Sequence, residues 1–432
     1  MTRRVDDMDL KSLQLPQEDV FCIDCKSFFA SVESLKRCLH PLESRLCVVS
    51  RDDNRSGLIL ASSMSMKHHY GIKTGTRTYE IPQGLDDILL VPPRMATYIE
   101  ENRKLNEILL RFVSAEDWHP YSIDEGFINV TASRLLYGSP MQLAQLIQQT
   151  IWQELNLVVS IGIGRNPLMA KLALDLDAKH QAPTYISQWD YNTIPEKLWP
   201  IDDLNSVWGI GKRTERRLNQ LNIYSMEDLA QADLALLKKE FGIIGEQLYY
   251  HAYGIDFSDF SERYIPQSKG FGKSQVLTKD YRSRAEIERV ISEMTDQVAA
   301  RLRKHHFQAR KIHLSLGFSR SCYAPRFSHQ MTVDGTASSF DLIEAMLQLF
   351  RQHYRGHPVR SIAVQLGDIQ AESGMQLNLF EDPAVRERRF CLERTIDQLR
   401  DHYGYQSVVR TSSLMPGATA IARSKLVGGH LG

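Results

Sequence analysis

Cysteine is scarce in this chain of 432 residues, and its spacing excludes the usual structural uses of the residue. Six cysteines occur, at positions 22, 25, 38, 47, 322 and 391. No second close pair is present that could complete a zinc site with Cys22 and Cys25. Their C-x-x-C spacing also occurs in redox motifs, but two residues three apart on a strand face opposite sides of a sheet. We therefore expect Cys22 to be a buried strand residue.

Long hydrophobic runs are also lacking. No apolar stretch is long enough to cross a bilayer, and the N-terminal residues 1–7 lack the apolar core of a secretory signal. We therefore expect a cytoplasmic protein with no membrane partner. The chain has no internal repeat and no low-complexity tract. Its length exceeds that at which one hydrophobic core keeps growing, so several domains are expected.

Net charge is absent, because 52 Lys and Arg residues balance 52 Asp and Glu residues. Zero net charge argues weakly against a nucleic-acid-binding protein. The charge is uneven, however. Residues 261–370 carry 17 Lys and Arg against 10 Asp and Glu, together with six histidines. A basic surplus confined to one segment favours a phosphate-binding surface, although an ordinary α/β domain with a solvated basic face would show the same surplus.

Three carboxylates form the most informative pattern that is present. Asp24 follows the apolar run 20–23, and Asp124 and Glu125 are adjacent in Tyr-Ser-Ile-Asp-Glu-Gly-Phe. Because neighbouring side chains on a strand point to opposite faces, Asp124 and Glu125 can reach one metal only at a twist, a turn or a strand end. Carboxylate oxygens select Mg²⁺ or Mn²⁺, and two such ions serve phosphoryl transfer. The alternative is an ordinary solvated acidic pair.

The motifs around these carboxylates resemble those of a known family. Phe-Phe-Ala-Ser-Val-Glu at 28–33, Ser-Ile-Asp-Glu at 122–125, Ser-Ile-Gly-Ile-Gly-Arg-Asn at 160–166 and Met-Ala-Lys-Leu-Ala at 169–173 follow in the order and spacing of Y-family translesion DNA polymerases. The chain resembles the UmuC branch, as found in Gram-positive bacteria, more than the DinB or polymerase IV branch. The similarity covers roughly residues 18–380, and the motifs are specific in combination.

This resemblance implies a multidomain α/β (α+β) fold of the right-hand polymerase type. The expected domains are a palm at 1–35 and 90–178, fingers at 36–89, a thumb at 179–255, a linker at 256–268, a little finger at 269–370 and a C-terminal tail at 371–432. The implied activity is error-prone addition of deoxynucleotides to a primer on damaged DNA, as part of DNA repair and the SOS response. Asp24, Asp124 and Glu125 would be catalytic and would hold two Mg²⁺ ions, with Mn²⁺ as a substitute and the Cys25 backbone carbonyl as a further ligand.

Several residues are implied to contact the incoming nucleotide. Phe29 aligns with the steric gate that leaves no room for a ribose 2′-hydroxyl, with Phe28 beside it; the alternative for Phe29 is a core aromatic. Lys171 matches a family lysine that meets the triphosphate. The fingers depart from the family pattern, because Ser65 and His68 stand where many relatives carry Tyr and Arg. A neutral histidine is a weaker anion ligand than arginine.

Two segments are expected to bind DNA. Residues 207–214 indicate a helix-hairpin-helix, in which Gly209 and Gly211 allow the turn and Lys212 and Arg213 add charge near a phosphate; a plain helical hairpin with glycine caps is the alternative. A helix at 285–306 and strands near 310–318 and 359–366 complete a β-α-β-β-α-β pattern that resembles the little finger. The basic residues assigned there to sequence-independent backbone contacts are Lys269, Lys273, Arg310, Lys311 and Arg360.

The segment Gln-Leu-Asn-Leu-Phe at 376–380 resembles the peptide by which bacterial polymerases dock on the sliding clamp (the β subunit). Gln376 would fill a polar pocket, and Leu377, Leu379 and Phe380 would act as apolar anchors. An ordinary packing segment is the alternative. The sequence leaves open whether a UmuD-like subunit or a RecA filament is required, and what residues 384–432 do.

Two other functions use the same residues. A metal-dependent nuclease needs the carboxylates but neither a sugar gate nor a triphosphate ligand, so Phe29 and Lys171 argue against it. A catalytically silent DNA-binding or clamp-binding factor would keep the scaffold. The presence of all three carboxylates disfavours that reading, and the departures at Ser65 and His68 keep it open.

Overall fold

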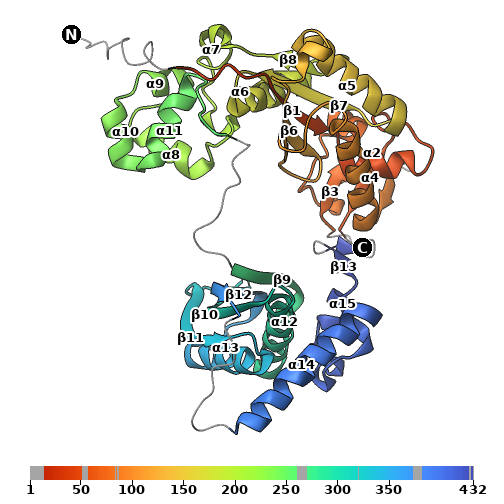
Figure 1. Cartoon of the computed structure of the whole chain (residues 1–432), viewed down its shortest axis with the longest axis vertical. Helices are drawn as coiled ribbons and strands as arrows, with labels where there is room; N and C mark the ends of the chain where they lie inside the picture. The colour runs from red at the N-terminus through yellow and green to blue at the C-terminus, as the bar shows by residue number, and fades with distance from the viewer. Residues whose placement is uncertain are drawn as a thin grey trace. The chain divides into compact units, whose positions relative to one another are not determined.

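The computed structural model of the protein describes residues 14–50, 57–82, 84, 87–259, 270–319, 321–372, 382–427 and 430–431. The chain divides into two compact units, Met1–Arg263 and Tyr264–Gly432 (Figure 1). Both units combine helices with sheets, which confirms the predicted mixed α/β class.

The first unit is built on a five-stranded sheet of order β5-β6-β1-β7-β8. Its strands are β1 (Val20–Cys25), β5 (Trp118–Pro120), β6 (Glu125–Asn129), β7 (Val159–Gly164) and β8 (Ile186–Gln188). All neighbours are antiparallel except β7 and β8. Helices cover both faces of this sheet, so β1 and β7 are buried on both sides and have a nearly continuous apolar sequence.

The alternation of side chains along β1 divides them between two cores. Phe21 and Ile23 pack with α2 (Phe28–Leu35), α4 (Met95–Leu109) and α5 (Pro140–Leu155). Val20 and Cys22 face α6 (Pro167–Leu172) and the π-helical turn η3 (Ala173–Asp177). Cys22 is fully buried, as its sequence context predicts.

Two glycines of β7 allow α6 and η3 to approach the sheet closely. A Cβ atom at Gly162 would overlap the Ala170 carbonyl oxygen and the Leu174 amide nitrogen, and one at Gly164 would overlap the Ala170 amide nitrogen. The short spacing between strand and helix sets the position of every side chain that α6 and η3 carry.

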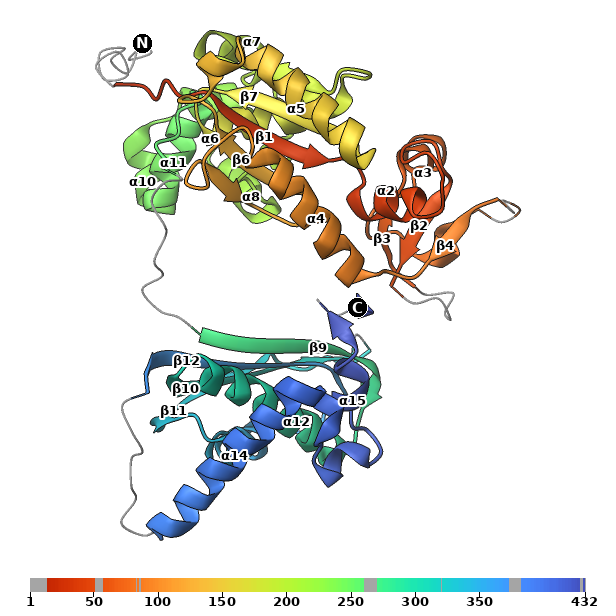
Figure 2. The same cartoon turned by 45° about the vertical axis from the view of Figure 1, so that its right-hand side comes forward.

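A smaller three-stranded sheet lies at one end of the five-stranded sheet, and a group of helices lies at the other end (Figure 2). The smaller sheet contains β2 (Leu46–Val49), β3 (Ile59–Ser62) and β4 (Leu89–Val91), and α3 (Met64–Tyr70) packs on it. The helices are α7 (Ile194–Lys197), α8 (Lys212–Gln220), α9 (Met226–Ala230), α10 (Leu234–Phe241) and α11 (Ile243–Ala252). They share one apolar core with α6.

The second unit contains a four-stranded antiparallel sheet of order β11-β10-β12-β9. Its elements follow along the chain as β9 (Gly270–Tyr281), α12 (Arg284–Lys304), β10 (Phe307–Phe318), β11 (Phe327–Thr336), α13 (Ser339–His353) and β12 (Val359–Ala371). This order is the β-α-β-β-α-β pattern that the sequence predicts. Alternate residues such as Ile312 and Leu314 pack against α12 and α13 in a single core.

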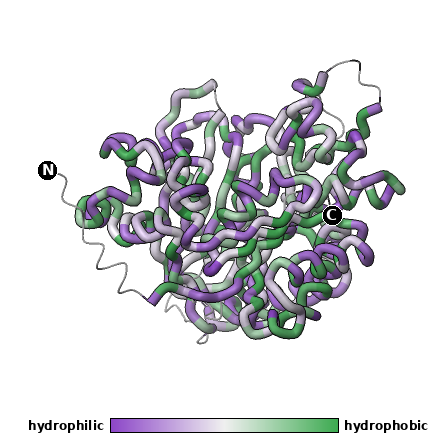
Figure 3. The backbone as a smooth tube through the Cα atoms, turned by 90° about the horizontal axis from the view of Figure 1, so that it is seen from above, coloured by the Kyte–Doolittle hydropathy of each residue, from purple (hydrophilic) through white to green (hydrophobic). Residues whose placement is uncertain are grey.

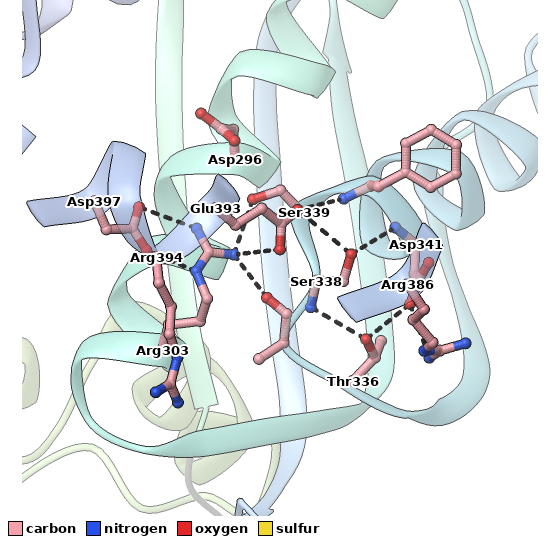
Figure 4. Close-up of polar contacts among 12 residues, drawn as sticks. Asp296, Arg303, Thr336, Ser338, Ser339, Asp341, Arg386, Glu393, Arg394 and Asp397 are labelled. Carbon is pink, nitrogen blue, oxygen red and sulfur yellow. Dashed lines mark hydrogen bonds and ion pairs between the residues drawn. The ribbon is translucent and has the colours of Figure 1, made fainter. Parts of the chain in front are cut away.

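The C-terminal segment is folded onto this unit and is not a free tail. It contains α14 (Pro383–Tyr403), α15 (Ala420–Arg423) and the strands β13 (Leu426–Val427) and β14 (His430–Leu431). Arg303 of α12, whose side chain is 4% exposed, donates to Asp397 at 2.6 Å and lies 3.4 Å from Glu393, both on α14 (Figure 4). Buried Asp296 likewise accepts bonds from Arg400 and Arg410. The contact of α14 with α12 is therefore held mainly by charges.

Within the described residues, no helix combines the length and the apolar character that a membrane span requires. Along the helices, hydrophobic and hydrophilic stretches alternate (Figure 3).

Candidate active site

Two of the three predicted catalytic carboxylates are paired by the register of the sheet. Asp24, near the end of β1, is the Cα partner of Glu125, the first residue of β6. Directly opposed residues of antiparallel strands point to the same face, so both side chains reach the face that α6 and η3 cover. Asp124 lies in the preceding turn, where its carboxylate accepts a bond from the Ser122 hydroxyl at 2.6 Å.

Three carboxylates with like charge lie near one another at this end of the sheet. The pKa of Asp24 is raised to about 6, mainly by burial and also by the nearby charges of Asp124 and Glu125, while Lys179 opposes the shift. Carboxylates that share one site in this way ionise together only when cations neutralise them. The chemistry of this donor set therefore fits a hard divalent cation.

The side chains themselves are not gathered into a ligand shell. Among the described residues, no three His, Cys, Asp or Glu side chains form a group that could hold a metal ion. The Glu125 carboxylate lies 2.5 Å from the Lys171 ammonium and accepts a bond from the Cys22 thiol at 3.3 Å. Asp24 lies 3.1 Å from Lys179. Two of the three carboxylates thus have lysines as partners, and a metal ion would have to compete with these.

A pocket of about 420 Å³ opens beside Asp24 and Asp124. Its walls come from the start of α2, from β3 and α3, and from the turn after η3. The residues that line it are Asp24, Cys25, Lys26, Ser27, Phe28, Phe29, Leu60, Ala61, Met64, Lys67, His68, Thr74, Asp124, Lys179 and His180. The predicted gate residue, the first carboxylate and three lysines therefore share one cavity.

Phe29 and Phe28 differ in their surroundings. Phe28 is 2% exposed and belongs to the core, whereas Phe29 is partly buried and lies at the edge of that core. The ring of Phe29 stacks on Tyr98 of α4. The Tyr98 hydroxyl donates to Glu33, which Arg94 also holds through two bonds. The side chain at the gate position is thus supported from below by a buried polar cluster.

The structure places Lys171 away from the pocket, and its contact with the triphosphate stays a prediction. This residue is 5% exposed, does not line the pocket, and forms ion pairs with Glu125 and Asp175. Lys179, which the sequence reasoning did not select, lies in the pocket instead. The motif at 169–173 contains Lys171 and not Lys179, so it could not point to the lysine that reaches the cavity.

Lys26 and Lys67 are two further pocket residues that the sequence reasoning missed. Lys26 donates to the Lys179 carbonyl oxygen at 3.0 Å and lies 3.9 Å from the centre of the Tyr185 ring. Burial lowers the pKa of Lys26 to about 8. Lys67 donates to the Ser27 hydroxyl at 2.8 Å. The position of Lys26, two residues after Asp24, was the sequence signal that could have identified it.

Of the two predicted residues in the fingers, the structure brings only His68 to the pocket. The Ser65 hydroxyl lies 3.3 Å from the His69 ring nitrogen one turn later on α3, and Ser65 does not line the pocket. The helical periodicity of α3 explains this correction, because residues 64, 67 and 68 share the face that looks toward the cavity.

The predicted DNA-binding glycines form the expected turn before α8. Gly209 has a φ of 93°, which favours glycine, and Gly211 is the residue before the helix begins. Lys212 and Arg213 are exposed on the first turn of α8. The indole nitrogen of Trp208 donates to the Tyr121 hydroxyl at 3.2 Å, which links this turn to the loop that carries Asp124.

The basic residues of the second unit do not share one face. Lys311 and Arg310 are exposed on β10, and Arg360 is exposed on β12 near Asp280. Lys273 points the other way: its ammonium donates to Gln297 of α12 at 2.6 Å, and burial lowers its pKa to about 8. Lys273 therefore lies on the helical side of the sheet, and its contact with DNA stays a prediction. Lys269 and the predicted clamp-docking residues Gln376, Leu377, Leu379 and Phe380 lie outside the described residues.

Comparisons with known proteins agree with this arrangement. Residues 23–175 match the impB/mucB/samB family, 268–379 match its C-terminal domain, and 205–256 match the thumb domain of DNA polymerase iota. A Bacillus subtilis (strain 168) protein named "Putative UV-damage repair protein UvrX" is 39% identical over 96% of this chain and 98% of its own length. "DNA polymerase IV 2" of the same organism is 30% identical over 96% of this chain and 99% of its own length. A solved Y-family DNA polymerase chimera of Dbh and Dpo4 has the same fold, with a TM-score of 0.64 at 21% identity over 82% of this chain and 99% of its own.

Proposed function

Because this chain belongs to the Y family of DNA polymerases and is a DNA-directed DNA polymerase, we propose that it extends primers with deoxynucleotides across damaged template bases. The pairing of relatives named for UV-damage repair and for DNA polymerase IV supports a role in DNA repair. We extend the proposal to error-prone synthesis during the SOS response, in the cytoplasm where bacterial DNA lies.

The observation that carries the proposal is the content of one pocket. Asp24 and Asp124, an aromatic ring at Phe29 and the ammonium groups of Lys67 and Lys179 line the same cavity of about 420 Å³. A nuclease site needs acids and a water molecule but no aromatic floor beneath a sugar. A cavity that offers acids, a flat ring and cations together suits a deoxynucleoside triphosphate.

We propose that Asp24, Asp124, Glu125 and the Cys25 carbonyl hold two Mg²⁺ ions, with Mn²⁺ as a substitute. Such ions would activate the primer hydroxyl and neutralise the leaving pyrophosphate. The residues of the chain then divide the remaining work. Phe29 excludes a 2′-hydroxyl, and Lys179, Lys67 and Lys26 attract the triphosphate.

The DNA contacts extend over both units. The turn at Gly209 and Gly211 presents amide groups and Lys212 and Arg213 to a phosphate. Lys311, Arg310 and Arg360 would contact the duplex backbone without reading bases. We also propose that residues 376–380 dock on the sliding clamp. Binding assays with the purified clamp test this docking, and assays with a UmuD-like subunit or RecA test whether either is required.

The test is primer extension on an undamaged template and on one with an abasic site, with Mg²⁺ and each dNTP. Asp124→Ala and Glu125→Ala are compared with Asp202→Ala, which removes an exposed acid outside the pocket. We expect the first two to lower the rate about a hundredfold or more, and the control to keep the parent rate.

Extension past the lesion that depends on both acids supports the proposal. Extension on the undamaged template alone removes the translesion part. If the protein is folded and binds DNA but extends no primer even with the clamp supplied, the catalytically silent factor is favoured. His68, which stands where many relatives carry Arg, is the observation that supports this alternative.

A further inference from the structure

Three residues with alternating charges form a row beside the end of the sheet that carries Asp24 and Glu125. Lys171, Asp175 and Lys179 are spaced four apart, from the end of α6 through η3 to the turn beyond it. The Asp175 carboxylate lies 3.0 Å from the Lys171 ammonium and 2.9 Å from the Lys179 ammonium. One acid therefore holds both lysines.

Each end of this row reaches a different catalytic carboxylate. Lys171 pairs with Glu125 at 2.5 Å, and Lys179 pairs with Asp24 at 3.1 Å. The two lysines differ in whether a bound ligand could contact them. The Lys171 side chain is 6% exposed and does not line the pocket, whereas the Lys179 side chain is 30% exposed and lines it. Lys171 is thus a fixed partner, and Lys179 is one that a ligand can reach.

The backbone of Lys179 has a hydrogen bond of its own, separate from the ion pairs of its side chain. Lys26 donates to the Lys179 carbonyl oxygen, and the π-helical turn η3 places residues 175 and 179 on the same side. Extra-residue turns of this kind recur at functional sites.

An ammonium and a divalent cation cannot share the same carboxylate oxygens at full strength, because each neutralises the charge that attracts the other. We propose that Lys179 is an exchangeable counter-ion of Asp24, tethered by Asp175, which a divalent cation displaces from Asp24 toward the triphosphate of the incoming nucleotide. This inference rests on the proposed function, since it assumes that Asp24 is a metal ligand. It makes metal entry and triphosphate capture one coupled event.

The experiment measures Mn²⁺ binding to the full-length chain, without DNA or nucleotide, from the loss of the free Mn²⁺ signal in electron paramagnetic resonance. The relevant component is the binding that Asp124→Ala removes. Lys179→Met should bind this Mn²⁺ about tenfold more tightly than the parent protein, because the competing cation is gone. Lys179→Arg, which keeps the charge, should stay within about threefold.

Two matched controls separate competition from a general loss of positive charge. Lys26→Met and Lys67→Met each remove one charge from the same pocket, but their ammonium groups bond to a carbonyl and a hydroxyl and not to Asp24. Each should tighten Mn²⁺ binding less than about threefold. Lys179→Gln provides a second neutral variant if Lys179→Met is not folded by circular dichroism.

A kinetic measurement should show weaker nucleotide binding in the same variant that binds Mn²⁺ more tightly. In Mn²⁺-saturated primer extension, Lys179→Met should raise the KM for dTTP about tenfold or more, because the triphosphate loses its cation. Tighter Mn²⁺ with a higher KM is an outcome that a merely structural role would not produce.

Three results are distinguishable. Tighter binding in both neutral variants and not in the controls supports the exchange. Unchanged or weaker binding in Lys179→Met and Lys179→Gln, with the Asp124-dependent component still present, overturns the exchange and leaves the proposed metal site standing. No Asp124-dependent Mn²⁺ binding in any variant overturns the metal site and, with it, the exchange.

Discussion

The ring of Phe29 lies parallel to that of Tyr98, with centroids 4.3 Å apart and planes inclined by 15°. One of these residues lines the pocket, and the other is fully buried on α4. The stack therefore fixes the position of the Phe29 ring in the wall of the pocket, and the proposed selection of the sugar would depend on both residues.

Removing the ring at the floor should relax sugar selection. In Phe29→Ala the space of the ring becomes available to a 2′-hydroxyl, and overlap of this size costs about 1–3 kcal/mol. We expect the ratio of ribonucleotide to deoxynucleotide incorporation to rise about 10- to 100-fold in single-nucleotide extension. Phe28→Leu, a change in the adjacent core ring, should leave the ratio near the parent value. An unchanged ratio in Phe29→Ala would remove Phe29 from the gate.

Removing the support beneath the floor should have a smaller effect of the same kind. Tyr98→Leu abolishes the stack and leaves Phe29 free to tilt, so we expect ribonucleotide use to rise several-fold, within the range of about 0.5–1.5 kcal/mol for an aromatic pair. Tyr98→Phe is the matched control, because it keeps the ring and removes only the bond to Glu33. If Tyr98→Phe changes the ratio as much as Tyr98→Leu, the hydroxyl and not the stack sets the floor.

The close approach of α6 to β7 predicts a large cost for a single methyl group. A Cβ at Gly162 meets backbone atoms of Ala170 and Leu174, which cannot move aside as a side chain can. We expect Gly162→Ala to lower the free energy of unfolding by about 3 kcal/mol, seen in thermal denaturation. Gly211→Ala is the control, since nothing lies within 4 Å of its added Cβ and its φ is −94°. Equal costs for the two variants would contradict the close approach.

The buried position of Lys273 predicts a pH-dependent gain from replacing it. Burial lowers its folded pKa to about 8 from an ordinary 10.5, so between these values the unfolded chain binds more protons. Stability of the parent protein should therefore rise with pH across this window, and the charged lysine costs stability below it. Lys273→Met should be more stable at pH 7 by about 1 kcal/mol after allowance for solvent screening, and the advantage should vanish near pH 10.5. Urea unfolding at both pH values tests this.

The same residue provides a test of the DNA-binding face. Lys311→Ala should weaken duplex binding and reduce its salt dependence by about one ion, measured by fluorescence anisotropy across a salt series. Lys273→Met should do neither, because its ammonium faces α12. Equal losses would return Lys273 to the interface.

Breaking the charged contact of α14 should release that helix. Arg303→Met leaves Asp397 and Glu393 without their buried partner, at a cost of about 3–5 kcal/mol. Amides of α14 should then exchange hydrogen roughly a hundredfold faster, by mass spectrometry. Lys304→Met, the neighbour whose pair with Asp401 is exposed, should change exchange by less than about fivefold. Slow exchange in Arg303→Met would show that apolar contacts hold the helix.

The sequence was informative where a local period or a contiguous motif decides the structure. The strand before Asp24 is expected from the apolar run 20–23, the β-α-β-β-α-β order from the pattern of elements, and the family from the order of the motifs. The family prediction is confirmed by the comparisons, whose relatives are named UvrX and DNA polymerase IV. Assignment to the UmuC branch, the domain boundaries and the roles of the site residues remain predictions.

The sequence was uninformative where the answer depends on a turn between elements. Lys171 and Lys179 each follow an alanine, and only the folded chain shows that Lys179 lines the pocket and Lys171 does not. The face on which Lys273 lies likewise depends on the register between β9 and β12, which the sequence does not report. The docking of α14 depends on ion pairs between residues 90 or more apart in sequence, which no local pattern reports.

The bond from Trp208 to Tyr121 joins the DNA-binding turn to a loop in which Asp124 follows three residues later. A thumb that rotates when it grips or releases the duplex would pull on this loop directly. The position of the turn before α8 and the position of the loop that carries Asp124 are therefore coupled through one hydrogen bond.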